Sequence, residues 1–204
     1  MSRKDGIHHA DAPHLIWESM GGETLYDAKI FRLRSVLRKS PDGTLAPFIS
    51  VDSPDWVTVV PELAPSGGED SPGAAADRRF LLVRQYRHGT EEVGLEFPAG
   101  VIDPGETPRE AAVRELLEET GYSAGELVEI GSVSPNPAFM TNTTHTFMAR
   151  ELRKVSGQDL DEHEILDVHE VGIEEIRRDI GTGVYASAIT VQAWYFYLKA
   201  IGEV

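Results

Sequence analysis

The segment TPREAAVRELLEETG, Thr107 to Gly121, constrains the fold most strongly because both ends of a helix are marked in it. Thr107 can cap the first turn, Pro108 suits the first helical position, and Glu110 stands where a capping box requires an acid. Gly121 supplies the stop, since glycine readily adopts the left-handed backbone that ends a helix. The segment therefore predicts a helix over residues 108 to 120.

Three carboxylates of this helix, Glu115, Glu118 and Glu119, fall at positions i, i+3 and i+4 and share one face. Like charges at this spacing repel each other by a few tenths of a kcal/mol per pair on an exposed helix. A divalent cation relieves that repulsion, and hard cations such as Mg²⁺ and Mn²⁺ prefer oxygen ligands. The spacing is compatible with a metal site and also with a solvated helix face.

The rest of the chain contains more strands than helices, which predicts an α+β fold with a mixed sheet covered by two or three helices. A hairpin is expected from Tyr26–Leu37 and the segment after the SPDG turn. Further strands are expected at 55–63, 79–87, 94–100, 126–134, 145–155 and 165–171, and helices at 172–183 and 186–202. No internal repeat is visible.

The expected organisation is a disordered terminus (1–13), an N-terminal β arm (14–50) and one catalytic domain (51–204). Between two of the strands, Ala64–Arg79 is rich in Pro, Gly, Ser and Ala without any period, and we interpret it as a mobile surface insertion.

Composition excludes several classes of site. The chain has no cysteine, so disulfides, zinc thiolate sites and cysteine nucleophiles are absent. The net charge of −15 argues against a nucleic-acid partner. The first residues lack the apolar stretch of a signal peptide, and no apolar run is long enough to span a bilayer, so we expect a cytoplasmic protein with no membrane partner.

Read outward from the three glutamates, the chain follows the pattern G-x5-E-x7-R-E-L-x-E-E-x-G from Gly100 to Gly121. This pattern resembles the Nudix box, the metal-binding signature of the Nudix hydrolases. Tyr122 stands where the pattern usually has an aliphatic residue. This position serves packing, so the departure does not affect the chemistry. The match implies a Nudix-type mixed sheet sandwiched by helices, with an N-terminal β arm.

The resemblance extends to the ADP-ribose and nucleotide-sugar pyrophosphatase branch of the family. Val83–Glu106 looks like the segment that precedes the box in that branch, and Glu162 and Glu164 form its late ExE pattern. The insertion Ala64–Arg79 departs from the branch, in which that turn is short. The implied reaction is metal-dependent hydrolysis of the pyrophosphate of ADP-ribose or a related nucleotide sugar.

The resemblance also implies a ligand set for Mg²⁺, or alternatively Mn²⁺: the carboxylates Glu115, Glu118 and Glu119, with the backbone carbonyl of Ala99. Arg114 is expected to brace these carboxylates by pairing with Glu110 or Glu118, and Glu106 to give structural support.

Three upstream residues are candidates for substrate binding. Arg84 and Arg87 have opposite parity on a strand, so at most one should face the site, and Arg87 resembles the phosphate-contacting arginine of the branch. The alternative for Arg87 is a solvated edge charge. Glu96 could point into the site or make a structural hydrogen bond.

The general base should come from a mobile loop, since a carboxylate bound to metal has its lone pairs committed. The acidic loop Ser156–Glu164 offers Asp159, Asp161, Glu162 and Glu164. The ExE pattern selects the two glutamates as catalytic candidates. We expect Glu162, because Glu164 adjoins Ile165, where the strand begins; a plain solvated loop is the alternative.

Two other functions fit parts of the sequence. A triphosphate-sanitising enzyme of the same fold should lack such an arm and approach the box differently, and a non-catalytic nucleotide sensor should have a degraded box, whereas all its carboxylates are present here. An isolated hairpin is marginal in water, so the apolar face of the hairpin at residues 26–50 needs a cover. The resemblance implies that the other subunit of a homodimer supplies it. Trp17, Phe31 or Trp56 could stack on a nucleobase or pack in the core.

Overall fold

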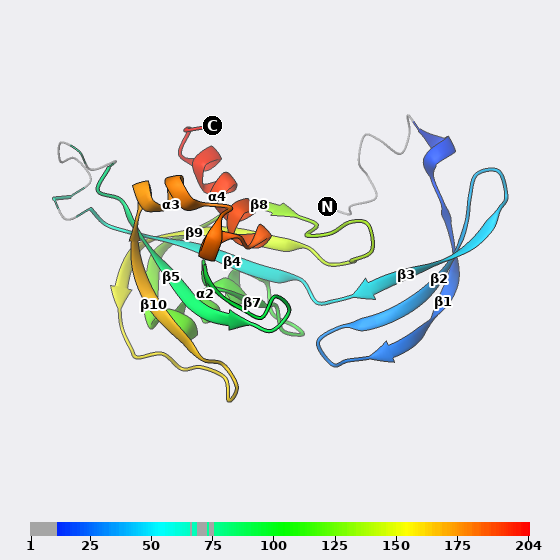
Figure 1. Cartoon of the computed structure of the whole chain (residues 1–204), viewed down its shortest axis with the longest axis horizontal. Helices are drawn as coiled ribbons and strands as arrows, with labels where there is room; N and C mark the ends of the chain where they lie inside the picture. The colour runs from blue at the N-terminus through cyan, green and yellow to red at the C-terminus, as the bar shows by residue number, and fades with distance from the viewer. Residues whose placement is uncertain (1–11, 66, 69–72, 74–75) are drawn as a thin grey trace. The chain divides into compact units, whose positions relative to one another are not determined.

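The computed structural model describes residues 12–65, 67–68, 73 and 76–204. Most of the expected terminal segment and part of the expected insertion therefore lie outside the described residues. The described chain forms two compact units: residues 12–54 with Asn136–Asn142, and Asp55–Pro135 with Thr143–Val204 (Figure 1). We describe each unit by itself.

The first unit is a three-stranded antiparallel sheet in the order β1-β2-β3. A short 3₁₀ turn, η2 (Pro13–Leu15), comes first. The strands are β1 (Glu18–Asp27), β2 (Arg32–Lys39) and β3 (Leu45–Asp52). The expected single strand Tyr26–Leu37 is wrong at its start, because a turn closed by the Ala28 N–H to Phe31 carbonyl bond (2.9 Å) separates β1 from β2.

The second unit contains a seven-stranded mixed sheet whose main path is β10-β5-β4-β9-β8, with β6 paired to β5 and β7 to β4. The β4 and β9 strands pair in parallel and the other pairs are antiparallel. The strands are β4 (Trp56–Leu63), β5 (Arg79–Arg87), β6 (Glu92–Glu96), β7 (Ala99–Val101), β8 (Tyr122–Val133), β9 (Thr144–Lys154) and β10 (Leu166–Gly172). The α+β prediction with a mixed sheet is confirmed.

Two predicted strands have different bounds. The segment 94–100 is two strands, β6 and β7, which pair with different neighbours on either side of Phe97 and Pro98. The strand expected from Glu126 begins at Tyr122, because Gly121 (φ 69°) turns the chain straight from the helix into the sheet.

Helices cover both faces of this sheet (Figure 1). They are α2 (Pro108–Thr120), α3 (Ile173–Asp179) and α4 (Ala188–Ala200), with a 3₁₀ turn, η3 (Gly183–Tyr185), before α4. Side chains alternate along β4, so Val57 and Val59 pack with α2 while Val60 joins the core beneath α3 and α4. In the described part of the chain, no helix has both the length and the apolar character to cross a membrane.

The ends of α2 are those predicted. The Thr107 hydroxyl accepts from the Glu110 N–H (3.3 Å), and the Glu110 carboxylate accepts from the Thr107 N–H (2.8 Å), which completes the capping box. The bonds from Thr107 hold the pKa of Glu110 below its usual value. Because Glu110 is used in this way, it is not the partner of Arg114.

Candidate active site

The most deeply buried carboxylate of α2 belongs to Glu119, which is only 1% exposed. Its Oε2 accepts a hydrogen bond from the Ala99 N–H (3.1 Å), so strand β7 is joined to the helix face. Its Oε1 is buried and has no partner among the described residues. Burial, together with the negative charges of Glu115 and Glu164, raises the pKa of Glu119 to about 9.

Glu115 lies against the same strand, β7, and its carboxylate fills the space that a side chain at position 100 would need. A Cβ placed on Gly100 would lie 1.9 Å from Glu115 Oε1. Burial raises the pKa of Glu115, while Arg114 works in the opposite direction. Glycine at position 100 therefore lets the Glu115 carboxylate contact the backbone of β7.

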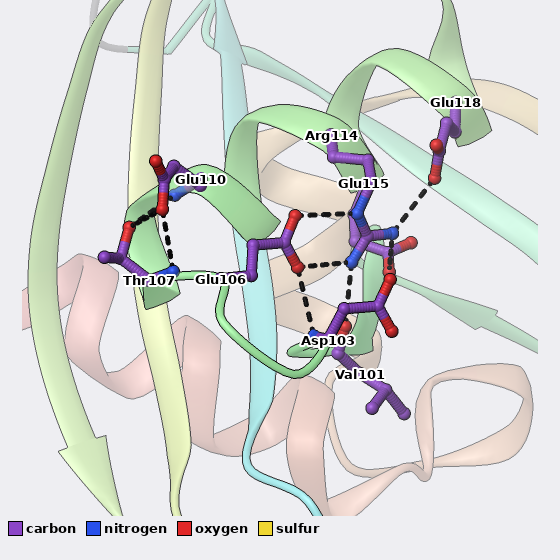
Figure 2. Close-up of polar contacts among 8 residues, drawn as sticks. All are labelled: Val101, Asp103, Glu106, Thr107, Glu110, Arg114, Glu115 and Glu118. Carbon is purple, nitrogen blue, oxygen red and sulfur yellow. Dashed lines mark hydrogen bonds and ion pairs between the residues drawn. The ribbon is translucent and has the colours of Figure 1, made fainter.

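Arg114 is the centre of an ion-pair network on this face (Figure 2). Its guanidinium donates to both oxygens of Glu106, each at 2.9 Å, and to the Val101 carbonyl at 2.9 Å. Its Nη1 donates to Glu115 (2.7 Å) and Glu118 (3.1 Å). Of the two partners expected for Arg114, Glu118 is the observed one, and Glu106 orients the arginine from the loop before the helix.

These residues suit a hard divalent cation in their chemistry. The donors are carboxylate oxygens, and one of them, Glu119 Oε1, is buried without a hydrogen-bond donor. In the described part of the chain no three acidic or histidine side chains are already gathered as a metal cluster, and Arg114 Nη1 is bonded to both Glu115 and Glu118. Binding would therefore need a rearrangement of side chains.

Arg87 and Glu96 form a bidentate ion pair, with Nε–Oε1 at 2.9 Å and Nη2–Oε2 at 3.1 Å. Glu96 is 6% exposed, while the Arg87 side chain is 44% exposed. The buried carboxylate therefore holds an arginine whose side chain remains partly exposed. Arg84 has the opposite parity on β5 and pairs instead with Asp167 (2.6 Å) on the surface.

A cavity of about 460 Å³ adjoins this pair and strand β7. Its polar lining includes Arg87 and Glu96, beside Ala99 and Gly100. The remaining wall is mostly apolar and includes Trp56, Val93, Val101, Val184 and Ile189. Of these residues, Trp56 was a candidate in the sequence analysis. The segment 183–189 was not predicted as part of the site, because its residues form no local motif.

The acidic loop places its two candidate bases differently. Glu162 is exposed, whereas Glu164 is half-buried. The charge of Glu164 contributes to the raised pKa of both Glu115 and Glu119. Of the two, Glu164 is therefore the one whose charge acts on the α2 glutamates, and the identity of the base stays a prediction.

The chain is similar to known proteins in both sequence and structure. The family model of the NUDIX domain matches residues 72–189. An ADP-ribose pyrophosphatase of Bacillus subtilis is 35% identical over 136 residues, which cover 63% of this chain and 74% of that protein. An ADP-sugar pyrophosphatase of Mus musculus is 30% identical over 153 residues, covering 71% and 65%. A crystal structure of an ADP compounds hydrolase superposes with a TM-score of 0.74 at 25% identity, covering 93% of this chain and 98% of that one.

Proposed function

This chain belongs to the Nudix family, and from that premise we propose that it hydrolyses the pyrophosphate bond of ADP-ribose or a related nucleotide sugar. The products would be a nucleoside monophosphate and a sugar phosphate. The chain is a Nudix pyrophosphohydrolase of the ADP-ribose pyrophosphatase branch. The observation that carries the proposal is the buried Glu119 carboxylate, with only one oxygen partnered, which is bonded to β7, the strand whose residues Ala99 and Gly100 line the cavity.

Mg²⁺, or Mn²⁺ in its place, would be held by Glu115, Glu118 and Glu119, with the carbonyl of Ala99. When bound, such a cation neutralises phosphate oxygens and lowers the pKa of water. The unpartnered Glu119 oxygen and the repulsion among the glutamates support this assignment. Arg114 would keep Glu115 and Glu118 close to the site while the cation is absent.

The protein groups around the cavity would bind and orient the substrate. Arg87, whose side chain is partly exposed, would contact a phosphate while Glu96 fixes its direction. Trp56 and the aliphatic wall would bury an uncharged part of the substrate, the base or the sugar. Glu164 would accept the proton of the attacking water, with Glu162 as its neighbouring alternative.

A substrate panel tests this proposal. Purified protein is incubated with Mg²⁺ and with ADP-ribose, other nucleotide sugars, dinucleotides or nucleoside triphosphates, and the products are separated by chromatography. We expect AMP and ribose phosphate from ADP-ribose, and no turnover in excess chelator. Turnover confined to triphosphates, or full activity in chelator, would contradict the proposal.

We also propose a homodimer formed through the three-stranded sheet of the first unit. All ten residues of β1 are exposed, and large apolar side chains of this unit face solvent: Met20, Leu25, Tyr26, Ile30, Leu45, Phe48 and Ile49. A small sheet with this much exposed apolar surface needs a cover, and a second copy would supply one. Analytical ultracentrifugation at micromolar concentration should show a dimer, and a monomer would refute this arrangement.

A further inference from the structure

The C-terminus of α2 is bonded to the acidic loop that follows β9. The last four carbonyls of a helix lack partners within the helix. Here the Leu117 carbonyl accepts from the Gly121 N–H (2.7 Å), and the Thr120 carbonyl accepts from Lys154 Nζ (2.6 Å). The remaining two carbonyls, those of Glu118 and Glu119, accept from the loop itself.

The loop makes these two bonds at adjacent residues. The Asp159 N–H donates to the Glu118 carbonyl (2.9 Å), and Gln158 Nε2 donates to the Glu119 carbonyl (2.7 Å). Both acceptors belong to residues whose side chains are candidate metal ligands. The backbone of the helix face and the loop are therefore held in register at this point.

The Gln158 amide also reaches the far end of the loop, because Nε2 lies 3.4 Å from the Leu166 carbonyl at the start of β10. One side chain thus connects Glu119 with the residue where the loop re-enters the sheet. Glu164 lies between these two anchors, two residues before Leu166. The position of Glu164 relative to Glu115 and Glu119 therefore depends on the two hydrogen bonds of Gln158 that hold the ends of the loop together.

We propose that Gln158 is a positioning residue, whose amide sets the placement of the loop carboxylate Glu164 relative to the carboxylate face of α2. The inference rests on the proposed function, in which Glu164 is the general base. In this role Gln158 contacts neither the substrate nor the metal. It acts through the loop that it closes.

Gln158→Met tests the proposal, because methionine has a similar length and no donor. Lys154→Met is the matched control: it also removes a bond to a C-terminal carbonyl of α2, but Lys154 lies on β9 and does not bridge to Leu166. We expect similar losses of Tm in the two variants. We expect kcat to fall about tenfold in Gln158→Met, with KM changed less than threefold, and to stay within about twofold of wild type in Lys154→Met.

A double-mutant cycle with Glu164→Gln separates positioning from general destabilisation. If Gln158 acts through Glu164, adding Gln158→Met to Glu164→Gln lowers kcat by less than twofold further. A full additional tenfold loss, or equal kcat for Gln158→Met and Lys154→Met, overturns the positioning role. If Glu164→Gln by itself keeps wild-type kcat, the base assignment is wrong and the positioning role falls with it. A loss in Glu164→Gln without a loss in Gln158→Met overturns the positioning role alone.

Discussion

Gly100 and Glu115 are in direct contact: a Cβ on residue 100 would lie 1.9 Å from a carboxylate oxygen of the glutamate. The atom that must yield is the end of a flexible side chain, so Gly100→Ala should displace Glu115 rather than unfold the protein. We expect metal affinity and kcat/KM to fall at least tenfold, with Tm changed by only a few degrees. Gly172→Ala is the control, because a Cβ there meets nothing within 4 Å. Equal activity in both variants would contradict the contact.

Glu119→Gln should stabilise the protein when metal is removed with chelator. The folded pKa of Glu119 is about 9, against an ordinary value of 4.5, so the folded state holds its proton more tightly than the unfolded chain. The contribution of Glu119 to stability is therefore lost as pH rises between these values. Thermal unfolding at pH 5 and pH 8.5 should show a gain from the substitution that grows with pH. Added Mg²⁺ should stabilise wild type much more than the variant.

Arg114→Lys should separate charge from geometry. Lysine keeps the positive charge but cannot donate simultaneously to Glu106, Glu115, Glu118 and the Val101 carbonyl as the guanidinium does. We expect unfolding in urea to show a loss of about 2 kcal/mol, and kcat/KM to fall at least tenfold. Arg178→Lys, in which an exposed pair with Asp179 is weakened, should change neither measurement appreciably.

Glu164→Gln should lower kcat by about a hundredfold or more if this residue is the general base. Metal binding should stay nearly intact, since Glu164 is not a proposed ligand. Glu162→Gln is the paired variant, and its exposed side chain predicts a smaller loss of kcat. A larger loss for Glu162→Gln would return the role to the carboxylate that the sequence favoured. Steady-state kinetics and Mg²⁺ titration measure the two effects separately.

Trp56→Ala should weaken substrate binding through the cavity wall. Loss of an aromatic contact worth about 1 kcal/mol would raise KM roughly fivefold while kcat changes little. Trp56→Phe should recover most of the affinity, because a ring is retained. If KM is the same in all three proteins, the indole does not contact the substrate.

Features that depend only on neighbouring residues could be predicted from the sequence. The helix bearing Glu115 and Glu119 was predicted with its ends, because a capping box and a terminal glycine act within a few residues. Strand segments such as β5 were also recognisable from their composition. The start of β2 was missed, because the turn at Ala28–Phe31 depends on a backbone bond without a strong residue signal.

Which distant residues meet depends on the packing of the whole fold. The pairing of β5 with β6 brings Arg87 to Glu96, and the packing of η3 and α4 brings Val184 and Ile189 to the cavity. Burial by several elements together, which a local pattern cannot report, gives Glu119 its raised pKa. The choice between Glu162 and Glu164 likewise depends on how the loop is held between α2 and β10. Contacts between residues far apart in the sequence are set by strand register and by side-chain packing. Register and packing depend on many core residues acting together, so no single motif predicts them.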